Sequence, residues 1–254
     1  MKDLDDHKKI AVLIDADNAQ YSKVKAILDE ISAHGHIVIK RAYGDWSSEY
    51  LKNWKQSLNE LAIQPVQQFA YTTGKNSTDA SMIIDAMDLL YSNKFDAFAL
   101  VSSDSDFTKL ASRLRESEIF VFGVGEKKTP VSFRNACDDF ILTENLNSDV
   151  VSPLTTDNED EKVESIVTEK SDSTVLIPML KKVWEQYQDE DGWTNVAAAG
   201  SFLKRAMPDF DPRTYGVSKL SEIIKELSND FEMKKYKLKG VVNIVAFRSK
   251  TTEE

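Results

Sequence analysis

The stretch Ile10-Ala-Val-Leu-Ile-Asp15-Ala-Asp-Asn18 joins five apolar residues directly to carboxylate and amide side chains. A second stretch has the same form, because the apolar run Ala97-Phe-Ala-Leu-Val101 leads into Ser-Ser-Asp104-Ser-Asp106. Continuous apolar runs of this length are typical of strands that are covered on both faces of a parallel sheet. We therefore interpret both stretches as buried strands that end in acidic loops.

Helices and strands are predicted to alternate outward from these two runs. Apolar residues recur at helical spacing between the strand-like segments, as in Val24, Ile27, Leu28 and Ile31. Strands are expected near residues 10–14, 36–43, 65–71, 95–101, 119–124 and 140–142, with helices near 24–31, 50–61, 77–90 and 110–114. This alternation predicts an α/β fold whose parallel sheet carries helices on both faces.

The composition supports a folded chain and argues against a membrane protein. Of the 254 residues, 41% are hydrophobic and 29% are charged, which is enough apolar material for a packed core. No apolar run approaches the ~20 residues that span a bilayer, and the charged first nine residues lack an apolar signal core. The single cysteine, Cys137, excludes an internal disulfide and a CxxC-type zinc site, so we expect a cytoplasmic protein.

Charge is unevenly distributed along the chain. The net charge is −10, and residues 149–172 alone hold eight acidic and two basic side chains. A net negative charge on the whole chain argues weakly against nucleic-acid binding. However, residues 149–172 supply more than half of that net negative charge, so the argument is weaker for the rest of the chain. The composition of this segment predicts a flexible acidic linker over residues 149–173. The linker would separate a domain at residues 8–146 from a smaller one at 174–248.

Acidic residues gather where the predicted strands end. Asp15 and Asp17 follow the first strand, Asp104 and Asp106 follow the 95–101 strand, and Asp79 opens the next predicted helix. Parallel sheets place ligand sites outside the carboxyl ends of their strands. If the two strands are neighbours, these oxygen ligands suit a hard cation, Mg²⁺ or Mn²⁺. The alternative for Asp79 and Asp106 taken singly is that each caps a helix.

Other kinds of site find less support. Gly123-Val-Gly125 follows a strand but lacks the further glycine and Lys-Ser/Thr of a phosphate loop, which disfavours a domain that binds a small phosphorylated ligand. Ser102 and Ser103 have no histidine in a comparable setting. Asp85 lies six residues after Asp79, which turns it to another face of the same helix.

The acidic segments resemble those of the NYN domain, a PIN-like nuclease domain of the LabA-like group. The resemblance rests on Ile10–Asn18, on Lys75-Asn-Ser-Thr-Asp79 with Ile84-Asp85, and on Val101–Phe107, and it covers about residues 8–146. It implies a PIN-like parallel sheet and a divalent-metal ribonuclease whose acidic site is Asp15, Asp79, Asp104 and Asp106. Asn18 would support the site by hydrogen bonding, with Asp17, Asp85 and Ser103 as further supporting residues. Ser103 stands where the family often has glycine.

The C-terminal part has a different layout. Three amphipathic helices are predicted at residues 175–184, 196–203 and 218–227, followed by a two-stranded ribbon at 231–238 and 241–248, as in a winged-helix (α+β) domain. Gly192-Trp193, Phe202-Leu203-Lys204 and Phe210–Ile224 resemble the OST-HTH, or LOTUS, domain, which implies RNA binding or, in some members, protein docking. The basic residues that could contact phosphates are Lys204, Arg205, Arg213, Lys219, Lys234, Lys235, Lys237 and Lys239, with Lys75 in the first domain. Alternating lysines also guard edge strands against aggregation, and that alternative stays open.

These observations together predict a cytoplasmic, Mg²⁺- or Mn²⁺-dependent ribonuclease with a tethered RNA-binding domain. RNA is the expected partner, a protein partner of the LOTUS domain is possible, and no membrane partner is expected. The main alternative is a non-catalytic RNA-binding or regulatory protein that keeps a vestigial nuclease site. The oligomeric state is not determined by the sequence.

Overall fold

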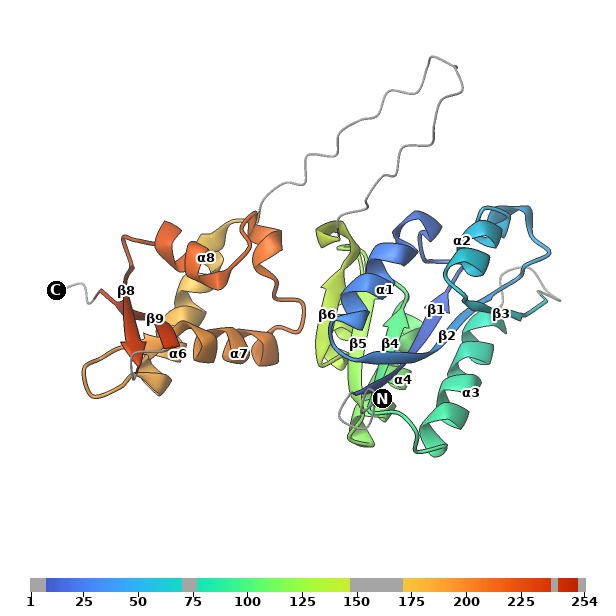
Figure 1. Ribbon diagram of the computed structural model, residues 1–254, viewed down its shortest axis with the longest axis horizontal. Helices are drawn as coiled ribbons and strands as arrows, with labels where there is room; N and C mark the ends of the chain where they lie inside the picture. The colour runs from blue at the N-terminus through green and yellow to red at the C-terminus, as the bar shows by residue number, and fades with distance from the viewer. Residues whose placement is uncertain (1–7, 70–76, 147–170, 239–241, 251–254) are drawn as a thin grey trace, which may run out of the picture. The chain divides into compact units, whose positions relative to one another are not determined.

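The computed structural model describes residues 8–69, 77–146, 171–238 and 242–250, with the side chains of 237, 238, 242 and 243 excepted. These residues form two units, one within residues 1–164 and one within 165–254 (Figure 1). The predicted linker lies outside the described residues up to residue 170.

The first unit is built on a parallel sheet of six strands in the order β3-β2-β1-β4-β5-β6. The strands are β1 (Lys9–Asp15), β2 (His36–Gly44), β3 (Gln64–Gln67), β4 (Ala97–Val101), β5 (Phe120–Gly125) and β6 (Asp139–Leu142). The helices are α1 (Val24–Ser32), α2 (Trp54–Glu60), α3 (Ser77–Tyr91), α4 (Thr108–Glu116) and α5 (Val131–Ala136). The predicted PIN-like α/β sheet with helices on both faces is confirmed.

Helices cover both faces of this sheet (Figure 1), and a hydrophobic core lies on each face. On one face, Val12 and Ile14 of β1 pack with the apolar side of α1 and with Trp54 of α2. On the other face, Leu13 of β1 packs with residues of α3, α4 and α5. Side chains on successive strand residues point to opposite faces, so a strand that is covered on both sides must be apolar throughout. All five residues of β4 are buried for this reason.

The strand order creates a switch point between β1 and β4. Ile14 of β1 pairs with Val101 of β4, so the two strands end side by side. From β1 the chain proceeds outward through β2 and β3, and from β4 it proceeds in the other direction through β5 and β6. The loops that follow β1 and β4 therefore diverge, and ligands of parallel sheets bind in the crevice at such a point.

The structure departs from the expected elements at a few places. The third strand ends at Gln67 rather than 71, and residues 70 and 71 of the expected range lie outside the described residues. The helix expected over 50–61 is a 3-10 turn at Glu49–Leu51 followed by α2. The short helix α5 was not predicted, because only Phe133 and Ala136 of its six residues are buried. So short an element carries little periodicity.

The second unit has the predicted winged-helix layout. Its helices are α6 (Ile177–Tyr187), α7 (Val196–Ala206) and α8 (Leu220–Glu226), and its antiparallel sheet has the order β7-β9-β8. The strands are β7 (Thr194–Asn195), β8 (Phe231–Leu238) and β9 (Val242–Ser249). The sequence pattern predicted the two long strands and missed β7, which has two residues. The unit begins before residue 174, because Ser171 N donates to Thr214 O at 3.1 Å and Asp172 caps a 3-10 turn.

Among the described residues, no helix combines the length and the apolar character needed to cross a bilayer.

Candidate active site

Three carboxylates converge at the edge of the sheet beyond β1 and β4. One oxygen from each of Asp79, Asp104 and Asp106 lies within 4.8 Å of the others. Asp79 and Asp104 are half-buried, and Asp106 is exposed. Asp79 and Asp106 also line an open depression with Ser105, Thr108, Lys109 and Ser132, among others. The acidic cluster, as we call Asp79, Asp104 and Asp106, is thus accessible to a ligand from solvent.

Local backbone structure positions each member of the acidic cluster. Asp104 ends the extended segment after β4, and its side chain caps the 3-10 turn at Ser105–Phe107 by accepting from Asp106 N at 2.9 Å. Asp106 lies inside that turn. Asp79 lies in the first turn of α3. In this loop the capping role that the sequence offered to Asp106 is therefore taken by Asp104.

Asp15 is fully buried and does not belong to the acidic cluster as the structure defines it. Its Oδ2 accepts hydrogen bonds from Asn18 Nδ2 and Ser102 Oγ, both at 2.7 Å, and its Oδ1 accepts from Asp17 N at 3.2 Å. Burial raises the pKa of Asp15, and the Asn18 and Ser102 hydrogen bonds partly offset that rise. Asp15 interacts electrostatically with Asp79, so the two acidic groups share one electrostatic environment.

The electrostatics of Asp79 reflect the crowding of carboxylates. Burial is the largest cause of a raised pKa for Asp79, and the charges of four neighbouring carboxylates, Asp15, Asp104, Asp106 and Asp17, act in the same direction, so that together they raise this pKa to about 6. Like charges disfavour ionisation of each other, and a bound cation would remove that penalty. A donor set made only of carboxylate oxygens suits a hard cation such as Mg²⁺ or Mn²⁺.

Two of the expected supporting residues, Asn18 and Asp17, interact with Asp15. Asn18 holds the Asp15 carboxylate, as expected for that position. Asp17 is exposed and acts on Asp15 and Asp79 through its charge. Ser103 instead accepts a hydrogen bond from Glu126 N at 2.9 Å, which ties the loop after β4 to the end of β5.

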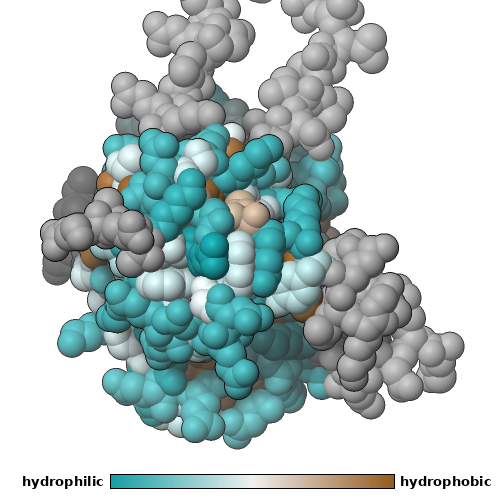
Figure 2. All heavy atoms as spheres, turned by 90° about the vertical axis from the view of Figure 1, so that its left-hand side faces the viewer, coloured by the Kyte–Doolittle hydropathy of each residue, from teal (hydrophilic) through white to brown (hydrophobic). Residues whose placement is uncertain are grey.

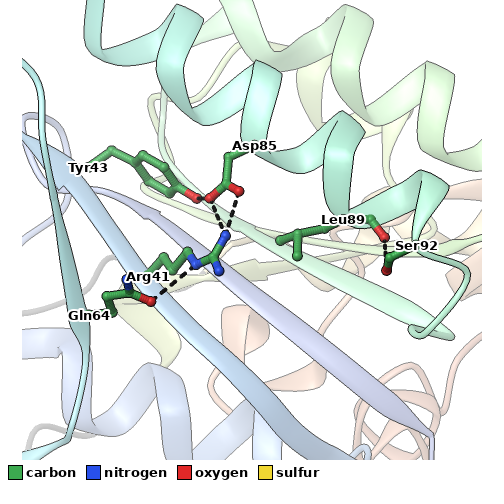
Figure 3. Close-up of polar contacts among 6 residues, drawn as sticks. All are labelled: Arg41, Tyr43, Gln64, Asp85, Leu89 and Ser92. Carbon is green, nitrogen blue, oxygen red and sulfur yellow. Dashed lines mark hydrogen bonds and ion pairs between the residues drawn. The ribbon is translucent and has the colours of Figure 1, made fainter.

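Asp85 takes part in a separate polar cluster (Figure 3). Its carboxylate accepts from Arg41 Nη1, at 2.7 Å to Oδ2, and from the hydroxyl of Tyr43, and Arg41 Nε also donates to Gln64 Oε1 at 3.3 Å. These contacts link α3 to β2 and β3. Burial and the Asp85 carboxylate raise the pKa of Tyr43, so its hydroxyl stays protonated and donates. Asp85 thus links α3, the helix that carries Asp79, to the sheet.

Ser102 is the residue of this site that the sequence did not indicate. Its hydroxyl donates to Asp15 Oδ2 and accepts from Asp104 N at 3.1 Å, which connects the end of β1 to the acidic loop after β4. Ser102 is 2% exposed. The only signal in the sequence was its position as the first polar residue after an apolar strand, and that position does not reveal the direction of the side chain.

The basic residues predicted to contact RNA are scattered over several elements. Lys204 and Arg205 lie in the last turn of α7, and Lys219 immediately precedes α8. The guanidinium of Arg213 pairs with Asp211 at 2.7 Å. Lys235 is exposed on β8. Lys75, Lys239 and the side chain of Lys237 lie outside the described residues.

Comparisons with solved structures found distant matches. A protein of unknown function from Vibrio parahaemolyticus RIMD 2210633 matches with 19% identity and a TM-score of 0.46, covering 54% of this chain and 94% of that one. An uncharacterized protein from Nitrosomonas europaea matches with 23% identity and a TM-score of 0.30, covering 41% of this chain and 96% of that one. No curated protein matches the chain.

Two family models match the chain, one over each unit. The model of the OST-HTH/LOTUS domain matches residues 169–242, which contain most of the winged-helix unit. The model of the NYN domain matches residues 9–146, which contain the whole sheet and all three residues of the acidic cluster. NYN domains belong to the PIN-like nuclease superfamily. Because this second match spans more than half of the 254 residues, the chain belongs to the NYN domain family.

Proposed function

We propose that this chain is a ribonuclease that hydrolyses RNA phosphodiesters with a divalent cation, Mg²⁺ or Mn²⁺. The observation that carries the proposal is the convergence of Asp79, Asp104 and Asp106, with oxygens within 4.8 Å of one another, in a domain of the NYN family. Structural carboxylates are usually paired with cations or spread apart, because bringing like charges together costs free energy. A cluster at the switch point of a parallel sheet is better explained by a ligand that needs it.

Asp79, Asp104 and Asp106 are the residues that would hold the cation. When bound, such a cation lowers the pKa of coordinated water and stabilises charge on a phosphodiester. Asp15 is buried and acts on Asp79 through its charge, and the hydroxyl of Ser102 and the amide of Asn18 hold its orientation.

The surface beside the acidic cluster suits a phosphate backbone. Lys109 is exposed in the wall of the same depression, together with the hydroxyl-bearing residues Ser105, Thr108 and Ser132. A lysine and hydroxyl groups bind and position phosphates without reading their sequence. We assign the OST-HTH/LOTUS unit the capture of RNA, because a second module on the same chain raises the effective concentration of RNA at the first.

The decisive experiment compares cleavage and binding in the same protein. Labelled single-stranded and structured RNAs are incubated with the full chain in Mn²⁺, in Mg²⁺ or in EDTA, and we expect cleavage only with a metal. Asp104→Asn keeps the capping oxygen for Asp106 N but removes the charge, so cleavage is expected to fall steeply while RNA binding persists. Asp88→Asn, at an exposed position of α3, is the matched control and is expected to cleave normally.

Two outcomes would contradict the proposal. Unchanged cleavage by Asp104→Asn would place the chemistry elsewhere or in a contaminating nuclease. RNA binding by the wild-type chain without cleavage in any divalent metal would favour the non-catalytic alternative.

A further inference from the structure

The hairpin of the second unit carries an unusual concentration of positive charge. Residues 231–250 hold six basic side chains and one acidic side chain, in a chain whose net charge is −10. The six are Lys234, Lys235, Lys237, Lys239, Arg248 and Lys250. A local basic patch on an acidic chain attracts anions to that patch. The hairpin is therefore the part of this unit best suited to a polyanion.

Strand register places two of these cations on the solvent face of the sheet. Phe231 and Met233 of β8 pack into the hydrophobic core of the unit, so the alternate residues Glu232, Lys234 and Tyr236 project to the opposite face. Arg248 pairs with Glu232 across the two strands and lies on that same face. Tyr236 is 36% exposed.

Trp193 completes this face from the loop before β7. The Lys234 ammonium lies 4.2 Å from the centroid of the Trp193 ring and 5.2 Å from that of Tyr236, and the Arg248 guanidinium lies 4.9 Å from that of Trp193. Cation and ring thus alternate in the order Arg248, Trp193, Lys234 and Tyr236. We call these four residues the aromatic–basic row.

The backbone holds Trp193 in place before any ligand arrives. Trp193 N donates to Asp189 Oδ1 at 2.7 Å, and Asp189 N donates to Trp193 O at 2.8 Å. These two hydrogen bonds join the two ends of the loop at residues 189–193. A residue whose backbone is already fixed loses less entropy when a ligand stacks on its side chain.

We propose that the aromatic–basic row binds single-stranded RNA, with bases on the aromatic rings and phosphates on Lys234 and Arg248. Sites for single strands combine a basic track with exposed rings, because every base has a face that stacks. Lysines alone would also be explained as guards of the edge strand β8, but guarding an edge requires no aromatic rings. The proposal rests on RNA capture by this unit, proposed above, and assigns that capture to the sheet face rather than to the helices.

The hydrophilic surface on this side of the second unit favours a polar occupant over an apolar one. Hydrophilic residues dominate the face shown in Figure 2, which is viewed from the side where β8 and β9 lie in Figure 1, and no broad apolar patch interrupts them. An apolar partner would need such a patch. Asp189, Glu190 and Asp191 precede Trp193 in the chain. Phosphates are therefore expected to run along the hairpin and not across that loop.

Fluorescence anisotropy with a short labelled single-stranded RNA tests this assignment, using the full chain in EDTA so that binding is measured without cleavage. Tyr236→Leu removes the ring and is expected to weaken binding by about fivefold or more, because stacking on one ring contributes about that much. Tyr236→Phe keeps the ring and should bind as the wild type does. Lys234→Gln should reduce the slope of log affinity against log salt by about one, and Lys225→Gln, exposed on α8, should leave it unchanged.

The outcomes separate this inference from the proposed function. Wild-type affinity in both Tyr236→Leu and Lys234→Gln, with a loss in Lys204→Ala/Arg205→Ala, would overturn the sheet-face site and place RNA on the helices. Absence of RNA binding by the wild-type chain would overturn the sheet-face site and RNA capture together. Cleavage of RNA in Mn²⁺ by the wild-type chain, combined with an RNA affinity that neither Tyr236→Leu nor Lys234→Gln lowers, would overturn the sheet-face site alone and leave the proposed ribonuclease in place.

Discussion

The crowding of carboxylates around Asp79 predicts that removing one charge stabilises the metal-free protein. The change is Asp79→Asn, which keeps the size of the side chain. The pKa of Asp79 is raised from 3.8 to about 6, so ionisation of this group opposes folding. A shift of about two units corresponds to ~3 kcal/mol for a fully buried group. Because Asp79 is half-exposed, screening by solvent reduces this to about 1–2 kcal/mol.

The sign of the effect sets its pH dependence. Ionisation of Asp79 destabilises the native state because its pKa is raised on folding. Below pH 3.8, the unfolded pKa, the group is protonated in both states and stability is not reduced; above about pH 6, the native pKa, the full reduction in stability applies. At pH 7.5 in EDTA, Asp79→Asn should be more stable than the wild type by about 1 kcal/mol, after subtracting the lost favourable interaction of an acid with the helix N-terminus. The difference should disappear near pH 4.

Calorimetric or denaturant unfolding of the full chain measures this difference. Asp88→Asn makes the same charge change at an exposed position of the same helix and is expected to alter stability by less than about 0.5 kcal/mol. Adding Mn²⁺ should stabilise the wild type more than Asp79→Asn, because a ligand that binds only the native state stabilises it in proportion to its affinity. Lower stability of Asp79→Asn in EDTA at pH 7.5, or equal stabilisation of both proteins by Mn²⁺, would refute the reasoning.

Three further substitutions test how the acidic site is supported. Ser102→Ala removes a hydrogen-bond donor to the buried Asp15 carboxylate and should lower the free energy of unfolding in denaturant by about 1.5–3 kcal/mol. Calorimetric titration should also show weaker Mn²⁺ binding, and unchanged metal affinity would show that Ser102 does not act on the site. Asp85→Asn weakens the contacts with Arg41 and should lower stability by about 1–3 kcal/mol, yet reduce Mn²⁺ affinity less than Asp79→Asn does; an equal loss would make Asp85 part of the metal site. Gly125→Ala would place a Cβ 2.7 Å from the Ser102 carbonyl oxygen and should cost about 1–3 kcal/mol in thermal unfolding, whereas wild-type stability would mean that the loop shifts freely.

Most of the first unit could be predicted because its signals are local. A strand covered on both faces must be apolar along its whole length, so β1 and β4 are visible as runs of five residues or more. The buried face of α1 is visible as the spacing of Val24, Ile27, Leu28 and Ile31. Elements with few buried residues, such as α5 and β7, leave too little pattern to detect.

The acidic site could be predicted only in part. The sequence placed Asp79, Asp104 and Asp106 near strand or helix ends, and the structure brings these three together. It also placed Asp15 in the acidic site, which stays a prediction, and the structure adds that this carboxylate is buried and accepts hydrogen bonds from Asn18 and Ser102. How deeply a carboxylate is buried depends on residues far away in the chain, which spacing along the sequence does not contain.

The sequence by itself determined the order and type of the long elements, the presence of carboxylates at the strand ends, and the basic character of the C-terminal hairpin. These properties follow from the periods of helix and strand, which involve neighbours within a few residues. Only the tertiary structure decided that β1 adjoins β4, that Asp85 pairs with Arg41, and that Lys234 lies between Trp193 and Tyr236. Each of these depends on the register between segments distant in the chain, and a shift of one residue in a strand would turn its side chains to the other face.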